Sequence, residues 1–146
     1  MRQVDVSEKR VIRREATAQG FIRLRRSTLE LIRSGVVEKG DPVQLAQIGG
    51  VIGAKSVSSL LPLCHQLKIE SVQVSVELLD KDSCIRVVAR VIAHEKTGVE
   101  MEALAAVSIA LLNIWDLVKI YEKDSEGQYP ETEIFGIRVL EKVKGD

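Results

Sequence analysis

Residues 11–25 alternate between two sets of side chains with the two-residue period of a β-strand. One parity carries Arg13 and Glu15, whereas the other carries Arg14 and Ala16. Successive side chains of a strand point to opposite faces of the sheet. The parity that holds Ala16 is more apolar, so it is expected to face the core or a cleft. The segment is therefore predicted to be a strand with Arg14 on its inward side.

A short helix is predicted directly after this strand. Ser27 is a candidate N-cap, and Glu30 stands where the second side chain of a capping box lies. Gly35 follows the last residue of the helical pattern, at a position where glycine often ends a helix in the left-handed conformation. We therefore expect a helix between Ser27 and Gly35.

A second helix is predicted from Asp41, because a capping carboxylate followed directly by proline favours a helix start. It should run to about Leu61, where Pro62 stops it. Three glycines occur within a five-residue stretch of this helix and lower its intrinsic stability. Close packing of another helix or close approach of a ligand would compensate, and we favour packing. These glycines are Gly49, Gly50 and Gly53.

The second half of the chain predicts a hairpin, a long helix and a last strand. Two runs rich in Val and Ile, at 69–79 and 84–94, flank a polar turn, which favours an antiparallel hairpin. Residues 99–122 follow a long, mostly apolar helical pattern, and 134–142 form a last strand. This order predicts an α+β fold: a ferredoxin-like antiparallel sheet covered by helices, in one domain over residues 1–146.

The composition narrows the function classes only slightly. Hydrophobic residues make up 45% of the chain and charged residues 29%, which is typical of a folded globular protein. The formal net charge is zero, which argues weakly against nucleic acid or an anionic membrane as the main partner. We therefore expect a small-molecule partner and no nucleic acid.

Cysteine usage and hydropathy indicate the compartment. Cys64 and Cys84 form no CxxC pair, and the chain opens without an apolar signal segment. We expect no apolar run that approaches the roughly 18 residues needed to cross a bilayer. We therefore expect a cytoplasmic protein with free thiols and no membrane partner.

Arg14, Lys39 and Lys55 are candidate phosphate ligands. The inward guanidinium of Arg14 needs a partner, and its planar fork suits phosphate. A salt bridge within the protein, or extension into solvent, is the commoner arrangement for such a side chain. Lys39 lies just before the Asp41 cap, where helix N-terminal amides also favour anions. Surface lysines are common, so this phosphate corner is a hypothesis.

His65 stands directly after the predicted helix stop, beside Cys64. A packed histidine bonded to a backbone carbonyl is one interpretation, and a ligand-binding histidine is the other. The neighbouring thiol also suggests zinc, but the sequence holds no second Cys/His pair at ligand spacing. We therefore expect no metal at this segment.

The long helix carries a polar stripe. On a 3.6-residue period, Glu102, Asn113 and Asp116 lie on one face, and Lys119 lies one turn beyond Asp116. A helix that is otherwise apolar must be buried on more than one side, and buried acids have pKa values that shift readily. The pattern fits either an acid–base pair in a site or a surface ion pair worth less than about 1 kcal/mol.

Seven segments, in this order and at this spacing, resemble the cyclic pyranopterin monophosphate synthase family, also called the molybdenum cofactor biosynthesis protein C (MoaC) family. The two most specific in combination are residues 61–65 (LPLCH) and 96–104 (KTGVEMEAL). Together the segments span nearly the whole chain. The other five are residues 4–7, 14–16, 39–41, 48–55 and 115–119.

The resemblance implies a lyase that acts on a GTP-derived small molecule, 3′,8-cyclo-7,8-dihydro-GTP. The product would be cyclic pyranopterin monophosphate, with diphosphate released. The resemblance also implies a ferredoxin-like subunit that forms a homo-oligomer, a hexamer built as a trimer of dimers with active sites at subunit interfaces. We expect no cofactor, since nothing in the sequence requires one.

The family roles carry over onto matching positions of this chain. Asp116 and Lys119 would be the central acid–base groups, assisted by Lys39 from a loop that a neighbouring subunit could contribute. The remaining residues would bind substrate. Leu63, Cys64, His65, Glu100, Met101 and Glu102 would line the pterin and ribose part, and Arg14, Lys55 and Lys142 would neutralise the triphosphate.

Three positions depart from the family pattern. Gln66 stands where the family usually has proline, Gln47 where arginine is expected, and Glu95 where glycine is expected. Gln47 thus removes one cation from the phosphate region. The alternative hypothesis is a catalytically silent, oligomeric nucleotide-binding homologue. A nucleotide phosphohydrolase is disfavoured, because no carboxylate cluster at magnesium-ligand spacing occurs in the sequence.

Overall fold

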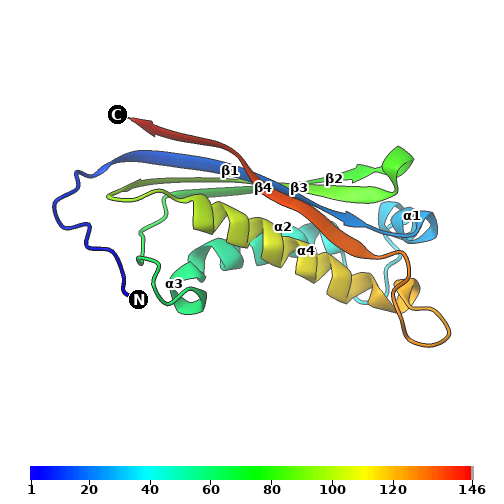
Figure 1. Cartoon of the computed structure of the whole chain (residues 1–146). Coiled ribbons are helices and arrows are strands. Elements are labelled where there is room, and N and C mark those ends of the chain that lie inside the picture. The colour runs from blue at the N-terminus through cyan, green and yellow to red at the C-terminus, as the bar shows by residue number, and fades with distance from the viewer. Residues whose placement is uncertain (146) are drawn as a thin grey trace.

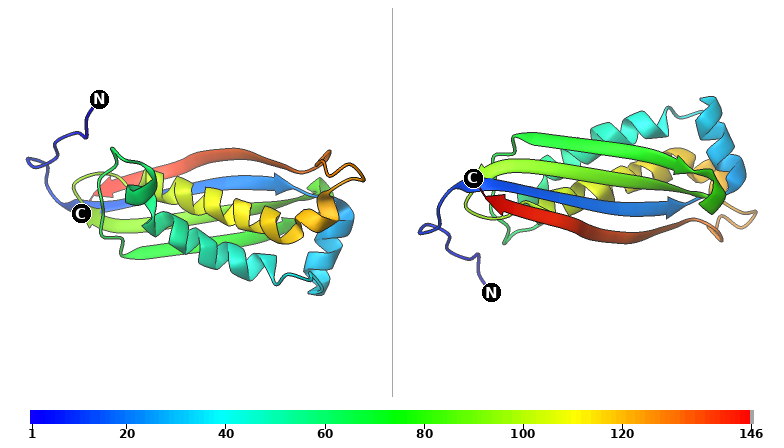
Figure 2. Two further views of the ribbon diagram at one scale, coloured as in Figure 1. Left: turned by 90° about the horizontal axis from the view of Figure 1, so that it is seen from below. Right: turned by 90° about the horizontal axis from the view of Figure 1, so that it is seen from above.

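The chain folds into two layers, with a four-stranded sheet below which two helices lie side by side (Figure 1). The computed structural model describes residues 1–145. Figure 2 shows that α2 (Pro42–Lys55) and α4 (Glu100–Glu122) cover one face of the sheet and leave the other face open. The remaining elements are β1 (Ile12–Arg23), α1 (Arg26–Ser34), α3 (Val57–Leu60), β2 (Ser71–Leu79), the 3₁₀ turn η1 (Asp80–Asp82), β3 (Cys84–Glu95) and β4 (Glu133–Gly145).

The sheet order is β2-β3-β1-β4, and every neighbouring pair is antiparallel. The hairpin β2–β3 is joined by the short turn η1, and β4 returns to the edge beside β1. A strand, helices, a hairpin, a helix and a last strand in this order form the ferredoxin-like βαββαβ arrangement. The prediction of an α+β fold with an antiparallel sheet covered by helices is confirmed.

The two-residue alternation of β1 places its small side chains against the helices. Ala16 and Ala18 are fully buried, and Arg14 is only 7% exposed on the same side. Gly20 brings α4 close, because a Cβ at this position would lie 2.7 Å from Val107 Cγ1. The predicted strand and the inward direction of Arg14 are therefore confirmed.

The glycines of α2 allow it to pack closely against α4. A Cβ at Gly53 would lie 2.8 Å from the carbonyl oxygen of Ala105, and one at Gly49 would collide with the side chain of Asn113. Helix packing, the interpretation favoured from the sequence, therefore explains these glycines. The contacts also show that the two helices run antiparallel, so the end of α2 lies beside the beginning of α4.

The start of α1 differs from the prediction. Ser27 is not the N-cap: the helix begins at Arg26, and no side chain of Arg25, the residue before it, caps it. The carboxylate of Glu122 instead accepts the Arg25 N–H (3.1 Å to Oε2) and the Thr28 hydroxyl. A tertiary contact from the end of α4 thus replaces the local capping box. Gly35 ends the helix with φ 71°, as predicted.

The second predicted helix begins as expected but ends early. The Asp41 carboxylate accepts the N–H groups of Val43 (2.9 Å) and Gln44 (3.4 Å). The helix stops at Lys55 rather than near Leu61, and Ser56 separates it from the one-turn helix α3. Pro62 follows the end of α3, so proline closes the helical segment without setting the break inside it.

The long helix α4 is the centre of the core. Ala103, Ala110 and Ile114 are fully buried between the sheet and α2. An 18-residue window of α4 has mean hydropathy 1.8, so by length and composition alone it could cross a membrane. The core helix of a folded domain passes the same test, and 44% of that window is buried inside the protein.

Candidate active site

Asp116 joins two lysines near the C-terminal end of α4. Its Oδ2 lies 2.8 Å from Lys39 Nζ, and its Oδ1 lies 3.0 Å from Lys119 Nζ. All three side chains are about half exposed. Lys39 comes from the loop between α1 and α2 of the same chain, so this contact needs no neighbouring subunit. The structure thus brings together the three residues predicted to be catalytic, which we call the Asp116 cluster.

The two ion pairs fix the protonation states of the Asp116 cluster. Hydrogen bonds from Lys39 and then Lys119 lower the pKa of Asp116 below its usual value. The hydrogen bond to Asp116 in turn raises the pKa of Lys119. At neutral pH the Asp116 carboxylate is therefore ionised and the Lys119 amine is protonated, which are the forms that can accept and donate a proton respectively.

A hollow opens on one side of the Asp116 cluster. It has a volume of about 450 Å³ and is lined by Asp116, Lys119, Trp115 and Tyr129, with Leu112 and Ile134. The Trp115 and Tyr129 rings meet edge to face, with centroids 5.1 Å apart. Sequence reasoning missed Tyr129, because it lies in an irregular polar loop that carries no periodic signal. The hollow offers an aromatic wall next to the acid–base groups.

Three predicted substrate-binding residues line an apolar hollow at the other end of α4. This hollow of about 480 Å³ is bounded by Leu63, Cys64 and Met101, together with Leu60, Leu61 and Pro62. Leu63 and Met101 are 42% and 40% exposed. We call the residues at this end the Glu102 group: Leu63, Cys64, His65, Glu100, Met101 and Glu102, with the cations Arg14, Lys55 and Lys142.

Glu102 is a buried acid without a cation. Its side chain is 2% exposed, and Oε1 has no hydrogen-bond partner among residues 1–145. Burial raises the pKa of Glu102 above its usual value. Burial also raises the pKa of the Cys64 thiol, and the negative charge of Glu102 adds to this effect. Burial thus makes the charged forms of this acid and this thiol less favourable than they are in water.

His65 contacts the segment that precedes β1. Its Nε2 lies 2.6 Å from the carbonyl oxygen of Val4, and Gln3 Nε2 donates to the Cys64 carbonyl oxygen at 3.2 Å. The first residues of the chain therefore run past the loop that follows α3 (Figure 1). A backbone carbonyl does satisfy His65, as one interpretation of the sequence held. The ring is partly exposed rather than packed in the core.

The three cations that the family resemblance assigns to the triphosphate differ in their surroundings. Arg14 donates to the carbonyl oxygens of Glu95 (3.3 Å) and Lys96 (3.2 Å). Its buried guanidinium is therefore hydrogen-bonded to backbone groups rather than to a carboxylate. Lys142 Nζ lies 3.4 Å from Glu100 Oε2. Lys55 is exposed at the end of α2 and makes no ion pair within residues 1–145. All three lie near the beginning of α4.

The Asp116 cluster and the Glu102 group lie far apart within one chain. Glu102 and Asp116 are fourteen residues apart on a single continuous helix. A rise of 1.5 Å per residue separates them by roughly 21 Å. One chain therefore brings together the three predicted catalytic residues, and separately the predicted substrate-binding residues, but it does not bring these two sets together.

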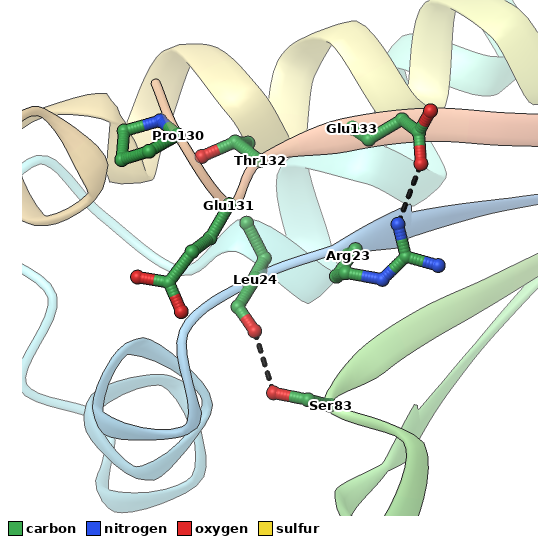
Figure 3. Close-up of a pocket in the computed structure, with 7 residues that line it drawn as sticks. All are labelled: Arg23, Leu24, Ser83, Pro130, Glu131, Thr132 and Glu133. Atoms are coloured by element: carbon green, nitrogen blue, oxygen red, sulfur yellow. Dashed lines mark hydrogen bonds and ion pairs between the residues drawn. The ribbon is translucent and has the colours of Figure 1, made fainter. Parts of the chain in front are cut away.

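A further cavity lies away from all twelve predicted residues. It has a volume of about 490 Å³ and is lined by Arg23, Leu24, Ser83 and residues 130–133 (Figure 3). Arg23 is paired with Glu133 at 2.5 Å, and Ser83 donates to the Leu24 carbonyl oxygen at 2.6 Å. Its polar groups are thus engaged with one another. Within residues 1–145, no group of three or more His, Cys, Asp or Glu side chains could hold a metal ion.

Comparison with known proteins places the chain in a family. The model of the MoaC family matches residues 3–145. The probable cyclic pyranopterin monophosphate synthase of Sulfurisphaera tokodaii is 50% identical over 97% of this chain and 92% of the relative. The protein of the same name from Sulfolobus acidocaldarius is 50% identical over 97% of each chain. A relative from Methanothermobacter thermautotrophicus, 49% identical over 99% of this chain and 89% of its own length, is named a probable cyclic pyranopterin monophosphate synthase accessory protein. The family prediction is confirmed, and the chain belongs to the MoaC family.

Proposed function

We propose that the chain is a lyase that converts 3′,8-cyclo-7,8-dihydro-GTP to cyclic pyranopterin monophosphate and diphosphate in molybdenum cofactor biosynthesis. The names of the relatives support this activity. The observation that carries it is the Asp116 cluster, where an ionised acid and two amines border an aromatic hollow. The proposal places the enzyme in the cytoplasm, and both cysteines are free thiols.

The Asp116 cluster supplies the proton transfers in this proposal. The ionised Asp116 carboxylate accepts a proton from the substrate, and the Lys119 ammonium donates one. Lys39 holds the carboxylate in its charged form between these steps. The cations Arg14, Lys55 and Lys142 neutralise the triphosphate, and stabilise the negative charge that develops as diphosphate leaves.

Each active site is completed by two copies of the chain. Reacting groups must lie within about 3.5 Å of the atoms on which they act, whereas the Asp116 cluster and the Glu102 group are roughly 21 Å apart along α4. Two copies of α4 packed antiparallel about a two-fold axis would bring the Glu102 group of one to the Asp116 cluster of the other. The pair would hold two equivalent sites.

The outer faces of the two helices support such an interface. Ile48 and Ile52 of α2 are 53% and 58% exposed, and Leu112 and Ile120 of α4 are both 54% exposed. Exposed apolar side chains of this size along two adjacent helices are typical of a surface that is covered in an assembly. We propose a homohexamer, a trimer of such dimers, which light scattering at micromolar concentration would test.

Mixing two inactive variants tests the shared site directly. Asp116→Ala removes the Asp116 cluster's acid, and His65→Ala removes a side chain of the Glu102 group. In a mixed dimer both defects fall in one site and the other site is intact. Random mixing should therefore restore about a quarter of wild-type turnover, since half of the dimers are mixed.

The measured reaction is conversion of the cyclised GTP derivative to oxidisable pterin and diphosphate. At a substrate concentration far below the KM of the His65→Ala protein, each variant alone should show almost no turnover. Mixtures that regain no turnover would show that both groups act within one chain. Wild-type protein that forms neither product would favour the alternative, a catalytically silent nucleotide-binding homologue, for which the accessory-protein name of one relative is the motivating observation.

A further inference from the structure

Tyr121, in the last turn of α4, contacts the loop that carries Lys39. Its hydroxyl oxygen accepts the backbone N–H of Glu38 at 2.9 Å. Glu38 is the residue directly before Lys39, whose amine lies 2.8 Å from Asp116. Tyr121 and Asp116 stand five residues apart on the same helix, so one rigid element holds both the loop backbone and the acid that the loop must reach.

The loop is shaped by local hydrogen bonds but joined to α4 by few. At one end Gly35 closes α1 with φ 71°, and at the other Asp41 caps α2. Between them the Gly40 N–H donates to the Val37 carbonyl oxygen at 3.3 Å, which makes Glu38 and Lys39 the central residues of a β-turn. These bonds set the loop's shape. Val37 is buried in the core and anchors the first half of the loop, whereas the distance of Glu38 and Lys39 from α4 depends on their own contacts.

Within residues 1–145, two side chains hydrogen-bond this turn to α4: Tyr121 through Glu38, and Lys39 itself through Asp116. The Lys39 side chain is 51% exposed. An exposed ion pair contributes at most about 1 kcal/mol and must overcome the rotamer entropy of a long lysine side chain. The Lys39 contact is therefore too weak to place the loop by itself.

We propose that Tyr121 is a positioning residue that fixes the 36–40 loop through the Glu38 N–H, so that Lys39 meets Asp116. This inference rests on the catalytic role proposed for Lys39. Tyr121 touches none of the three members of the Asp116 cluster by hydrogen bond; it acts on them through the loop backbone.

Two variants remove the same hydrogen bond from opposite sides. Tyr121→Phe deletes the accepting hydroxyl and keeps the ring that packs against the core. Glu38→Pro deletes the donating N–H at the first central position of the turn, where proline is well accommodated. The double variant should lose no more than either single variant, because both changes abolish one interaction.

Turnover and the titration of Asp116 are the two readouts. We expect each variant to lower kcat about tenfold with little change in KM, because displacement of a catalytic group by about 1 Å has effects of this order or larger. Three charged or titratable groups lie around the Asp116 carboxylate: Lys39, Lys119 and Tyr129. Of these only Lys39 is moved by the variants.

Carbon-13 NMR of the Asp116 carboxyl follows this movement without any substrate. Lys39 is the largest cause of the lowered pKa of Asp116, so loosening the loop should raise that pKa toward its usual value. The acidic limb of the kcat/KM profile, which reports the free enzyme, should shift to higher pH by the same amount. Lys39→Ala gives the upper limit of the shift.

Ser83→Ala is the matched control, because it removes another hydroxyl-to-backbone hydrogen bond, 2.6 Å to the Leu24 carbonyl oxygen, in a different turn. It should leave kcat and the Asp116 titration unchanged. A Tyr121→Phe variant with wild-type kcat and titration, or an equal effect from Ser83→Ala, would overturn the inference. If Lys39→Ala itself keeps full turnover, the proposed role of Lys39 fails, whereas the NMR shift still decides whether Tyr121 positions the loop.

Discussion

The two ends of α4 place a carboxyl group in opposite electrostatic surroundings. At the C-terminal end, Asp116 is half exposed and held between two lysines, and these hydrogen bonds lower its pKa. At the N-terminal end, Glu102 is buried with one oxygen unpartnered, and burial raises its pKa. One helix thus carries an acid with a lowered pKa at one end and an acid with a raised pKa at the other. The difference arises from surroundings alone, since both are carboxylates on the same element.

This contrast in surroundings indicates different roles for the two carboxyl groups. A paired, ionised carboxylate is ready to accept protons, whereas a buried carboxyl group with a free oxygen is suited to hydrogen-bond a ligand that enters. The loop behind the Asp116 cluster is fixed within one chain, while the hollow beside Met101 is open. We expect the first end to govern turnover and the second to govern binding.

The largest expected effect is on turnover at the C-terminal end. Asp116→Ala and Lys119→Ala should each lower kcat by roughly 10²–10⁴-fold, the range for loss of a general acid or base. Assembly should be intact by light scattering. Asp80→Ala is the matched control, since Asp80 forms an exposed ion pair with Arg33 at 2.6 Å and should leave kcat unchanged. If either variant dissociates into monomers, the Asp116–Lys119 ion pair is instead a structural element of the subunit interface.

A smaller effect is expected on binding at the N-terminal end. Lys142→Met should raise KM about tenfold, because one charge-assisted contact to phosphate is worth roughly 1.5 kcal/mol, and kcat should change little. Stability should change by well under 1 kcal/mol, since the Lys142–Glu100 pair is weak at 3.4 Å. Lys81→Met in the β2–β3 turn serves as the control. A fall in kcat without a change in KM would contradict a phosphate-binding role.

The smallest effect is a pH dependence of stability at Glu102. Because its pKa is raised in the folded state, the native protein keeps a proton that the unfolded chain has already released. Unfolding then releases a proton, so stability falls as pH rises from the unfolded value near 4.3 to the raised folded value. Glu102→Gln should lose this slope and gain on the order of 1 kcal/mol at neutral pH. Urea unfolding of both proteins across that range measures the difference, and a parallel pH dependence of their stability would contradict a raised pKa of Glu102.

Local signals predicted the elements well where the chain itself supplies the partner. Asp41 caps α2 through N–H groups two and three residues away, and Gly35 ends α1 in a left-handed conformation, as the sequence indicated. Ser27 failed as a cap because Glu122, ninety-seven residues beyond Arg25, takes over the start of α1. A contact between residues so far apart in the chain cannot be read from any local stretch of the sequence.

The candidate site likewise contains one contact that local spacing predicts and one that it does not. The Asp116–Lys119 pair follows from helical spacing, and it forms at 3.0 Å. The Lys39 contact, by contrast, spans seventy-seven residues and was expected only from the family resemblance. Tyr121 and Tyr129 were not predicted, because a single aromatic residue at a helix end or in a loop carries no periodic signal. Their roles depend on which loop lies next to them.

The sequence by itself determined the order of strands and helices, the inward side of β1 and the membership of the MoaC family, because period, capping chemistry and shared segments are properties of neighbouring residues. Tertiary structure alone decided the state of each acid. Whether a carboxyl group is ionised depends on the charges and the burial around it, and these come from elements distant in the chain. It also decided that Lys39 meets Asp116 and that Lys142 meets Glu100, because each contact joins elements that are distant in the chain.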